Sequence, residues 1–339
     1  MSVNIAYALA FSRVSGLGPK KLLEFKEEIL SLQDTQAAYP LLTKIQKKYA
    51  KQIKNIPDPD EFSSWISASS TLLEQQEDSG IHSIAYTDGD YPENFKRLDT
   101  PPLYFFYKGN QEALYQKGIA VIGTREVTGY TREVGRHIGQ YIAKKGFTVI
   151  SGLALGSDAA GHQGCLDAGG TTIAIVSTPL DQVYPRQNTQ LQNEILDNGG
   201  CVISEYPIGT PFMAQHLIAR DRLQSGLANG VFVVATGEKG GTWHAINGAI
   251  KLKIPLCYFD YTRVKAYNYK ADIHTQGMQK MASVGGYAIC SPAEFDDFLN
   301  KCSAENTSPV TSVTAVKHEE DQEYGPISLF TKNKDSGKQ

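Results

Sequence analysis

The stretch AVIGTREVTGYTREVGR, residues 120–136, decides the fold of this chain. An apolar run ends in Gly-Thr-Arg and passes into a segment that is predicted to be a helix. A strand, a turn of small residues and a helix start often form an anion site, because the first backbone N–H groups of a helix are free and carry partial positive charge. The stretch therefore predicts a phosphate site with Arg125 at its rim. The phosphate of a cofactor, of a free nucleotide or of a nucleic acid would fit it equally.

Similar apolar runs recur along the chain after residue 80, and amphipathic helical stretches separate most of them. Runs that are apolar on both faces and alternate with helices indicate a mostly parallel sheet that is covered on both sides. The predicted fold class is therefore α/β, with a Rossmann-like, doubly wound, mostly parallel sheet. Its expected strands are HSIAY, LYFFY, IAVIG, FTVIS, TTIAIV, CVIS, VFVVAT, PLCYF and YAIC.

The chain changes character twice, which predicts three parts: a helical domain over 1–78, the Rossmann-like domain over 79–302 and a flexible polar tail over 303–339. The helical domain contains SGLGPKKLLEF, in which two glycines allow a tight turn and Pro19 suits the first turn of the next helix. This turn resembles a helix-hairpin-helix, as in SAM-like domains, whose backbone amides contact a nucleic-acid phosphate. An ordinary turn between helices is the alternative.

Composition narrows the class of protein. The hydrophobic fraction of 41% and the charged fraction of 20% are those of a soluble globular protein. No run approaches the roughly 18 apolar residues of a membrane helix. The five cysteines form no CxxC pair, which predicts a reduced, cytoplasmic protein without disulfides or zinc. Because the net charge is −3, any binding of nucleic acid must use a local basic patch.

Five loops that follow successive predicted strands are rich in Gly, Ser or Thr, whose small side chains let an anion approach the backbone. A single loop of this kind is ordinary turn chemistry, but five at consecutive strand ends predict a phosphate-lined edge of the sheet. The loops are GTR (123–125), SGLALGSDAAGH (151–162), TPLDQVYPRQN (178–188), SEYPIGTP (204–211) and TGEKGGTW (236–243).

Several common cofactor-binding and catalytic motifs are missing from the sequence. Neither G-x-G-x-x-G after the first strand of the core nor a Walker A sequence is present, which disfavours NAD, FAD and ATP, so we predict no cofactor. The absence of GxSxG and HExxH gives no catalytic residue and no metal site. Asp158 and His162 stand four residues apart, and we interpret them as a hydrogen-bonded pair that orders the SGLALG loop.

Taken in order, these motifs resemble the DNA-processing protein A family (DprA, also called Smf). The shared features are GTR, SGLA with the later Asp and His, the Gly-Gly-x-T-I-A strand, LDxxYPxxN, SExPxG, RxRxxSGL and a late GGT. The N-terminal GLGPKKL and YPENFKRLDTPPLYFFYKG also match, so the resemblance covers about residues 5–260. It implies a single-stranded DNA-binding protein, typically a homodimer, that protects incoming strands and helps to load the RecA recombinase during transformation.

The resemblance also implies which residues contact DNA, mainly through backbone phosphates and without catalysis. The stacking of bases on Tyr184, Phe212 or Trp243 is a further possibility, and core packing is the alternative for each. If DNA binds in this way, Lys144 and Lys145 extend the row of phosphate contacts; the alternative is that they form a solvated helix end. The predicted DNA-binding residues are Gly123, Thr124, Arg125, Ser151, Gly152, Leu153, Arg186, Asn188, Arg220, Arg222, Gly240, Gly241 and Thr242.

The sequence departs from the family pattern at several points. Asp221 stands where the family has Asn, Ala235 replaces an acidic residue, and the polar tail replaces a winged-helix-like domain of some members. These departures fit a specialised paralogue, for example in phage defence or a toxin–antitoxin pair. The segment PISLF, Pro326–Phe330, resembles a sliding-clamp ligand, or a site for another partner protein, and packing on its own domain is the alternative.

Two other functions remain open. GEKGGTWHA resembles the PGGxGTxxE motif of the cytokinin-activating phosphoribohydrolases, nucleotide-processing enzymes of a related fold, but Ala245 or Ile246 stands near the place of the catalytic Glu. A sensor that binds a nucleotide and reports it to a partner would need the same phosphate loops as a DNA-binding protein.

Overall fold

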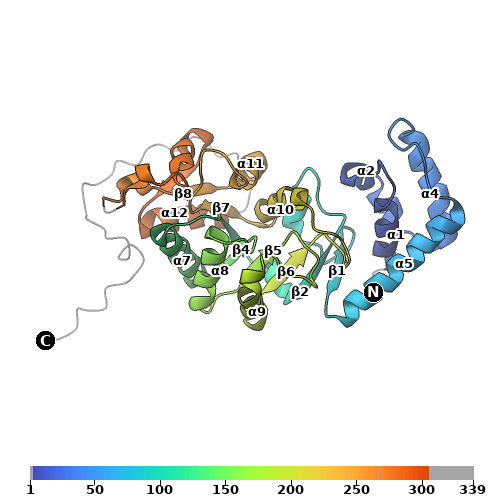
Figure 1. The fold of residues 1–339 in the computed structure, drawn as a ribbon, viewed down its shortest axis with the longest axis horizontal. Helices are drawn as coiled ribbons and strands as arrows, with labels where there is room; N and C mark the ends of the chain where they lie inside the picture. Colours follow the sequence, from blue (N-terminus) through green and yellow to red (C-terminus); the bar gives the residue numbers. More distant parts are fainter. Residues whose placement is uncertain (1–2, 266, 305–339) are drawn as a thin grey trace.

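The computed structural model describes residues 3–265 and 267–304, and within them five helices precede the first strand. These helices are α1 Val3–Ser12, α2 Pro19–Glu24, α3 Lys26–Leu30, α4 Thr35–Lys48 and α5 Pro59–Asp78. In Figure 1 they lie together at one end of the molecule, beside the edge of the sheet that carries β1.

The predicted turn between the first two helices is present. Gly16 has φ +86, and a Cβ there would lie 2.3 Å from the Gln52 carbonyl oxygen, so only glycine fits. Pro19 is the first residue of α2. The Lys21 ammonium donates to the Gly16 carbonyl at 2.6 Å, so this cation stabilises the turn itself. Contact between this turn and DNA stays a prediction.

The rest of the described chain is built around one sheet of nine strands, which confirms the predicted α/β class and each expected strand. The strand order is β1-β2-β6-β5-β4-β3-β7-β8-β9. The pairs from β6 through β9 are parallel, whereas β1 and β2 are antiparallel additions at one edge. The strands are β1 His82–Ala85, β2 Tyr104–Gly109, β3 Gly118–Ile122, β4 Thr148–Ser151, β5 Thr172–Ile175, β6 Cys201–Ser204, β7 Gly230–Val233, β8 Leu256–Phe259 and β9 Tyr287–Ile289.

Every residue of the strands from β3 to β8 is buried, because helices cover both faces of the sheet. In Figure 1 the green helices α7 and α8 lie on one side of the sheet and the gold helices α10 and α11 on the other. The connecting helices are α6 Glu93–Lys96, α7 Gly129–Lys144, α8 Ser157–Asp167, α9 Thr189–Asp197, α10 Ala214–Leu227, α11 Thr242–Leu252 and α12 Pro292–Ser303. Short 3-10 turns complete the connections at Gln111–Tyr115, Arg186–Asn188, Tyr261–Arg263, Tyr269–Ala271, Gln276–Lys280 and Ala282–Val284.

The winding direction of the sheet reverses between β3 and β7. From β3 the chain moves through β4 and β5 to β6, then returns across the sheet to β7 and continues to β8 and β9. In open α/β sheets the ligand binds beyond the carboxyl ends of the strands at such a switch point. The loops after β3 and β7, GTR and TGEKGGTW, are therefore the ones that flank this position.

Two clusters of buried apolar residues form the core. One spans the centre and far edge of the sheet, and includes Val121, Ile150 and Phe232. The other joins the N-terminal helices to the near edge of the sheet, from Phe11 and Phe62 through Phe106 to the strands β5 and β6. The chain is helical up to Asp78 and its first strand begins at His82, yet the second cluster continues across this point. The division at residue 78 stays a prediction.

Candidate nucleic-acid interface

The loop after β3 is fixed to both of its neighbours. The Thr124 N–H donates to the Ala235 carbonyl at the end of β7, at 2.8 Å, and the Thr124 carbonyl accepts from the Ser157 N–H at the start of α8, at 3.1 Å. A Cβ on Gly123 would lie 2.3 Å from the Ser157 hydroxyl, so the loop requires a glycine there. Held in this way, the loop carries the exposed Arg125 at the switch point.

The expected free helix start after GTR is not present. Helix α7 begins only at Gly129, and Thr128 caps it: its hydroxyl accepts from the Thr131 N–H, and the Thr131 hydroxyl accepts from the Thr128 N–H. The reciprocal cap satisfies donors that an anion would otherwise use. The cap does not involve the N–H groups of Gly129 and Tyr130, and Arg125 is the cation that the GTR loop itself offers to a phosphate.

The SGL turn, Ser151–Leu153, is held in place by hydrogen bonds to β3 and to Asn188. Ser151 donates its hydroxyl to the Val121 carbonyl at 2.6 Å, and Leu153 is fully buried with a left-handed φ of 60. The Asn188 amide donates to the Leu153 carbonyl at 2.8 Å, which holds this uncommon backbone conformation in place. The Ser151 hydroxyl, the Leu153 carbonyl and the Asn188 amide thus have partners within the fold, and the predicted contact of these three residues with DNA stays a prediction.

Asp158 and His162 do not pair, contrary to the expectation. The Asp158 carboxylate accepts the Gly152 and Ala154 N–H groups at 3.1 and 3.3 Å, whereas His162 Nδ1 lies 2.6 Å from the Thr172 hydroxyl. Of these two residues, Asp158 is therefore the one that binds the backbone of the SGLALG loop. Burial lowers the pKa of His162 to about 3, and the charge of Arg220 acts in the same direction, so this ring is neutral.

The two arginines of the RxR motif have different environments. Arg220 is 4% exposed and lies under the SGL turn: its Nη1 donates to the Ile175 carbonyl at 2.8 Å, and a Cβ on Gly152 would lie 1.4 Å from that nitrogen. Arg222 lies away from the switch point and binds both Glu205 carboxylate oxygens, at 2.7 and 2.5 Å. Its guanidinium is therefore occupied by an ion pair, and the structure does not bring Arg222 to the other predicted residues.

Asp221 lies between these arginines in sequence and faces the switch point. Its Oδ1 is 3.3 Å from Arg220 Nε, and its side chain is 16% exposed. Burial raises the pKa of Asp221 to about 6; the charge of Arg220 opposes this rise, and Asp158 adds to it. The interface therefore contains a carboxyl group that gains a proton slightly below neutral pH.

The loop after β7 forms the opposite wall. Gly240 and Gly241 are exposed, and Thr242 begins α11 with Gly241 as its N-cap residue. The Trp243 indole N–H donates to the Gly237 carbonyl at 3.0 Å, and the ring packs against the core. Trp243 is therefore a structural residue of this loop rather than a free stacking surface.

A cleft of about 480 Å³ opens between the loops after β3 and β7, and we call it the switch-point cleft. It brings together Gly123, Thr124 and Arg125 with Gly240, Gly241 and Thr242, and Arg220 lies in its wall. The remaining side chains that define the cleft are Ile122, Glu126, Ala154, Asp158, Ala214, Leu217, Ile218, Asp221, Gln224, Thr236, Lys239, His244, Ala245 and His274.

Arg125 also borders two other hollows at the same edge of the sheet. A groove of about 630 Å³, here called the helical groove, lies along α7, α8 and α9 and includes Arg132, Arg136 and Asn188. A smaller cavity of about 70 Å³ lies between Arg125, Leu155 and Tyr184. Arg125 is thus the residue that the three hollows share.

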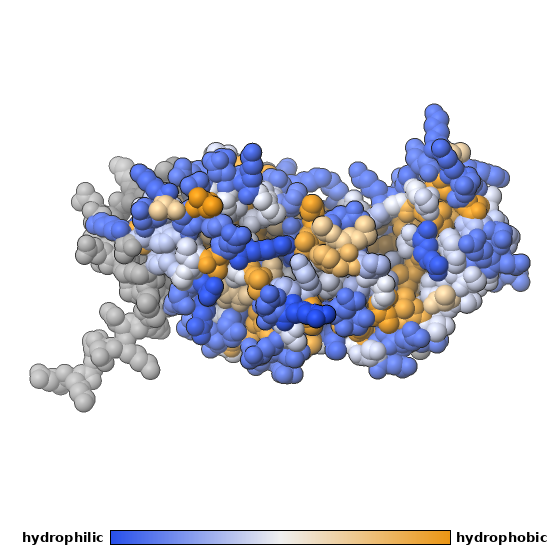
Figure 2. All heavy atoms as spheres, in the orientation of Figure 1, coloured by the Kyte–Doolittle hydropathy of each residue, from blue (hydrophilic) through white to orange (hydrophobic). Residues whose placement is uncertain are grey.

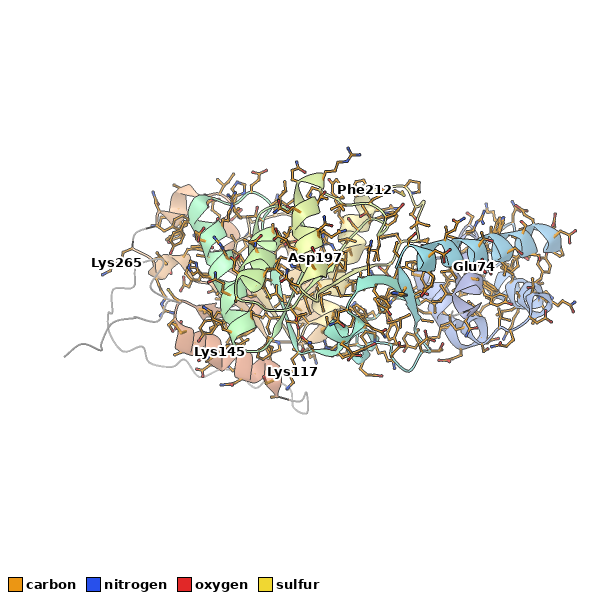
Figure 3. All side chains as sticks on the ribbon, turned by 90° about the horizontal axis from the view of Figure 1, so that it is seen from below. Glu74, Lys117, Lys145, Asp197, Phe212 and Lys265 are labelled. Atoms are coloured by element: carbon orange, nitrogen blue, oxygen red, sulfur yellow. The ribbon has the colours of Figure 1, made fainter. Side chains whose placement is uncertain are left out.

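Beside the small cavity, Tyr184 and Phe212 pair with ring centroids 4.7 Å apart and are 42% and 41% exposed. Arg186 follows Tyr184 in the same exposed turn but lies in none of the three hollows. In Figure 3, Phe212 lies on the side of the carboxyl ends of the strands, and Lys117 and Lys145 lie on the opposite side of the molecule. Lys145 pairs with Asp296, so it does not extend the predicted track.

Sequence reasoning missed the residues that complete the cleft. Lys239 and His244 belong to the TGEKGGTWH stretch but were not predicted as site residues, His274 reaches the cleft from a segment that no motif marks, and Arg132 and Arg136 on α7 line the helical groove. Asp221 was noticed as a departure, but its burial depends on how α10 packs and has no signal in the sequence.

Within residues 3–265 and 267–304, no helix is long and apolar enough to cross a membrane. The same described residues contain no group of three or more His, Cys, Asp and Glu side chains that would hold a metal ion.

The comparisons with known proteins agree with the motifs. The family model for DNA recombination-mediator protein A matches residues 82–298. Protein Smf of Synechocystis is 33% identical over 248 residues, which are 70% of this chain and 59% of that protein. DNA processing protein DprA of Bacillus subtilis is 32% identical over 240 residues, which are 70% of this chain and 78% of that protein.

Solved structures extend the agreement to the fold. DNA processing protein A of Streptococcus pneumoniae has a TM-score of 0.70 at 24% identity, over 88% of this chain and 98% of its own. DNA processing protein A of Helicobacter pylori has a TM-score of 0.57 at 26% identity, over 65% of this chain and 96% of its own, and its structure concerns a single-stranded DNA-binding mode. On the family match, these identities and the shared sheet, the chain belongs to the DNA recombination-mediator protein A family.

Proposed function

We propose that this protein binds single-stranded DNA at the carboxyl edge of its sheet and acts in DNA processing during recombination. The observation that carries the proposal is the position of Arg125. It is exposed, it stands at the switch point, and it borders both the switch-point cleft and the helical groove. A guanidinium binds phosphate in bidentate fashion, and a polymer can pass it in both directions.

The relatives support the same ligand. The Helicobacter pylori protein is described by its single-stranded DNA-binding mode, and the Bacillus subtilis and Streptococcus pneumoniae proteins are named for DNA processing. The expected contacts are with backbone phosphates, so the preference for sequence is low overall.

Binding of single-stranded DNA is tested by fluorescence anisotropy with a labelled 16-mer, as a single strand and as a duplex. We expect the single strand to bind more tightly. Its affinity should fall as salt rises from about 50 to 200 mM, because phosphate neutralisation releases counterions. A salt-independent affinity would contradict the phosphate model.

The second candidate is a nucleotide-binding sensor, which the volume of the switch-point cleft favours, since about 480 Å³ is the size of a small-ligand pocket. Competition separates the two functions. A mononucleotide that displaces the 16-mer at equal concentration would replace the DNA proposal with the sensor.

We also propose that the protein is not a nucleotide hydrolase. The phosphoribohydrolase motif places a catalytic Glu after its Gly-Gly-x-Gly-Thr, whereas Ala245 and Ile246 are buried apolar residues here. Incubation with nucleoside monophosphates should release no free base. Release that an Arg125→Ala variant abolishes would restore the enzyme alternative.

The remaining features are proposals from the family resemblance: a homodimer, delivery of strands to RecA, a cytoplasmic location, and a defence role as the specialised alternative to transformation. Light scattering after size exclusion tests the dimer directly. The proposed clamp or partner segment, Pro326–Phe330, lies outside the described residues.

A further inference from the structure

The switch-point cleft has apolar walls behind a polar rim. Ile122 and Leu217 line it together with Ile218, which is 53% exposed on α10. In Figure 2 apolar side chains reach the surface in the region of α10, bordered by hydrophilic ones. Such walls suit the flat faces of a nucleobase better than a phosphate group.

The charges inside the cleft also disfavour a phosphate. Arg220 is the buried cation of the cleft, and two carboxyl groups flank it: Asp221 Oδ1 lies 3.3 Å from Arg220 Nε, and Asp158 interacts with the same guanidinium. Arg125 and Lys239, which have no ion-pair partner among the described residues, are exposed at the rim. A phosphate therefore gains more from the rim than from the interior of the cleft.

One of the two carboxyl groups keeps the capacity to accept hydrogen bonds. Asp158 already accepts two backbone N–H groups. Asp221 has weak partners by comparison: Gln224 Nε2 donates to Oδ1 at 3.5 Å, and Arg220 Nε, although near, has no hydrogen bond of good geometry. Asp221 thus offers a largely unused acceptor to whatever enters the cleft.

We propose that one base of the bound strand inserts into the switch-point cleft and that Asp221 accepts hydrogen bonds from its amino and imino groups. The inference rests on the proposed DNA-binding function and adds a base preference at one position of the strand. Arg125 holds the phosphate of that nucleotide at the rim, while Ile122 and Leu217 pack on the base.

The acceptor selects among the bases by its chemistry. Guanine presents an imino N–H beside an amino group, so that both carboxylate oxygens of Asp221 receive a hydrogen bond. Cytosine and adenine each place one amino group beside an acceptor nitrogen. Thymine has a single imino N–H between two carbonyl oxygens, which the carboxylate repels. The expected order is guanine first and thymine last.

The test uses the full-length chain and labelled 13-mers of thymidine whose central base is dG, dA, dC or dT. For the wild type we expect the dG oligonucleotide to bind about tenfold more tightly than the all-thymidine one. Asp221→Asn should bind the two within about twofold of each other, because its amide presents a donor as well as an acceptor. The control is Asp296→Asn, which changes a carboxylate paired with Lys145 at the opposite edge and should keep the preference.

The outcomes separate the two proposals. Equal wild-type affinity for all four oligonucleotides, with binding retained, overturns the base pocket and leaves the DNA-binding function intact. A preference for dG that persists in a folded Asp221→Asn variant overturns the assignment to Asp221. A failure of every oligonucleotide to bind overturns the proposed function itself.

Discussion

At the scale of single residues, charge alone does not decide function. Arg125 and Arg222 belong to equally recognisable motifs, and both were predicted to bind phosphate. The structure leaves the Arg125 side chain exposed, whereas Arg222 neutralises Glu205 in a two-point ion pair and also donates to the Thr100 carbonyl. An arginine that is already held by a carboxylate has little left to offer a phosphate.

Arg125→Ala should weaken binding of a single-stranded 16-mer by about 1–3 kcal/mol, the range for a charge-assisted contact. It should also lower the salt slope by about one unit, because one phosphate contact is lost. Anisotropy titrations at several salt concentrations measure both effects.

Two other arginines serve as comparisons for this variant. Arg222→Ala should destabilise the fold and leave the salt slope unchanged. Arg263→Ala, which breaks an ion pair with Glu294 outside the three hollows, should leave DNA binding unchanged. A larger change of slope in Arg222→Ala than in Arg125→Ala would contradict the assignment of the phosphate contact.

Asp221 gives the interface a dependence on pH. Four charged or titratable groups face it: Arg220 on its own helix, Asp158 on α8, His244 on α11 and Arg125 on the loop after β3. Its ionised form repels a nearby phosphate and its neutral form does not. Affinity for oligothymidine should therefore rise as the pH falls through about 6, the pKa to which burial raises this carboxyl group.

Asp221→Asn carries no charge at either end of this range. It should bind oligothymidine more tightly than the wild type above the transition, by about 1 kcal/mol for a repulsion through partly solvated surroundings. Its affinity should change less between about pH 7.5 and 5 than that of the wild type. An equal pH dependence in both proteins would show that Asp221 is not the group responsible.

At the scale of elements, the loop after β3 and the SGLALG loop after β4 hold each other in position. Gly156 has φ +82, and a Cβ there would lie 2.5 Å from the carbonyl oxygens of Thr124 and Arg125. The SGLALG loop therefore rests directly against the backbone that carries Arg125. This contact joins Gly156 to residues 31 and 32 positions earlier in the sequence, and no local pattern predicts it.

Gly156→Ala tests this contact, and Gly146→Ala is its matched control. Both glycines have positive φ, but a Cβ on Gly146 would meet no atom within 4 Å. Gly146→Ala should cost about 1–2 kcal/mol of unfolding free energy from backbone strain alone. Gly156→Ala should cost about 2–4 kcal/mol, because a clash adds to the strain.

The two variants should also differ in DNA binding. Gly156→Ala moves the backbone of Arg125 and should weaken oligonucleotide binding, whereas Gly146→Ala should leave it unchanged. Denaturant titrations and anisotropy on the same preparations measure the two properties. Equal stability losses together with unchanged affinity in both variants would show that the loop contact does not position Arg125.

At the scale of the whole molecule, the sequence predicts the sheet well and the interface only in part. The buried strands are continuous apolar runs, and the switch point follows from parallel strands joined by helices. The details of the site depend on long-range packing. The ion pair of Arg222 with Glu205 and the contact of His162 with Thr172 each join groups on different elements, whose proximity is set by the assembled fold.

The arrangement of the hollows predicts how affinity depends on strand length. A strand whose base enters the switch-point cleft passes Arg125 and continues into the helical groove, where the exposed Arg132 has no ion-pair partner among the described residues. Affinity should therefore climb as the oligonucleotide grows from about 4 to 16 nucleotides, the span of single-strand sites. Anisotropy with a series of oligothymidines measures the climb.

Substitutions at the two arginines show whether the strand takes this path. Arg125→Ala should weaken every oligonucleotide, because all of them cross the rim of the cleft. Arg132→Ala should weaken the 16-mer and leave the 4-mer unchanged, because only a long strand reaches the groove along α7. Equal losses at both lengths would place Arg132 at the cleft itself. An affinity that does not change with length would mean that the protein holds a single nucleotide, because a path along two hollows must gain contacts as the strand lengthens.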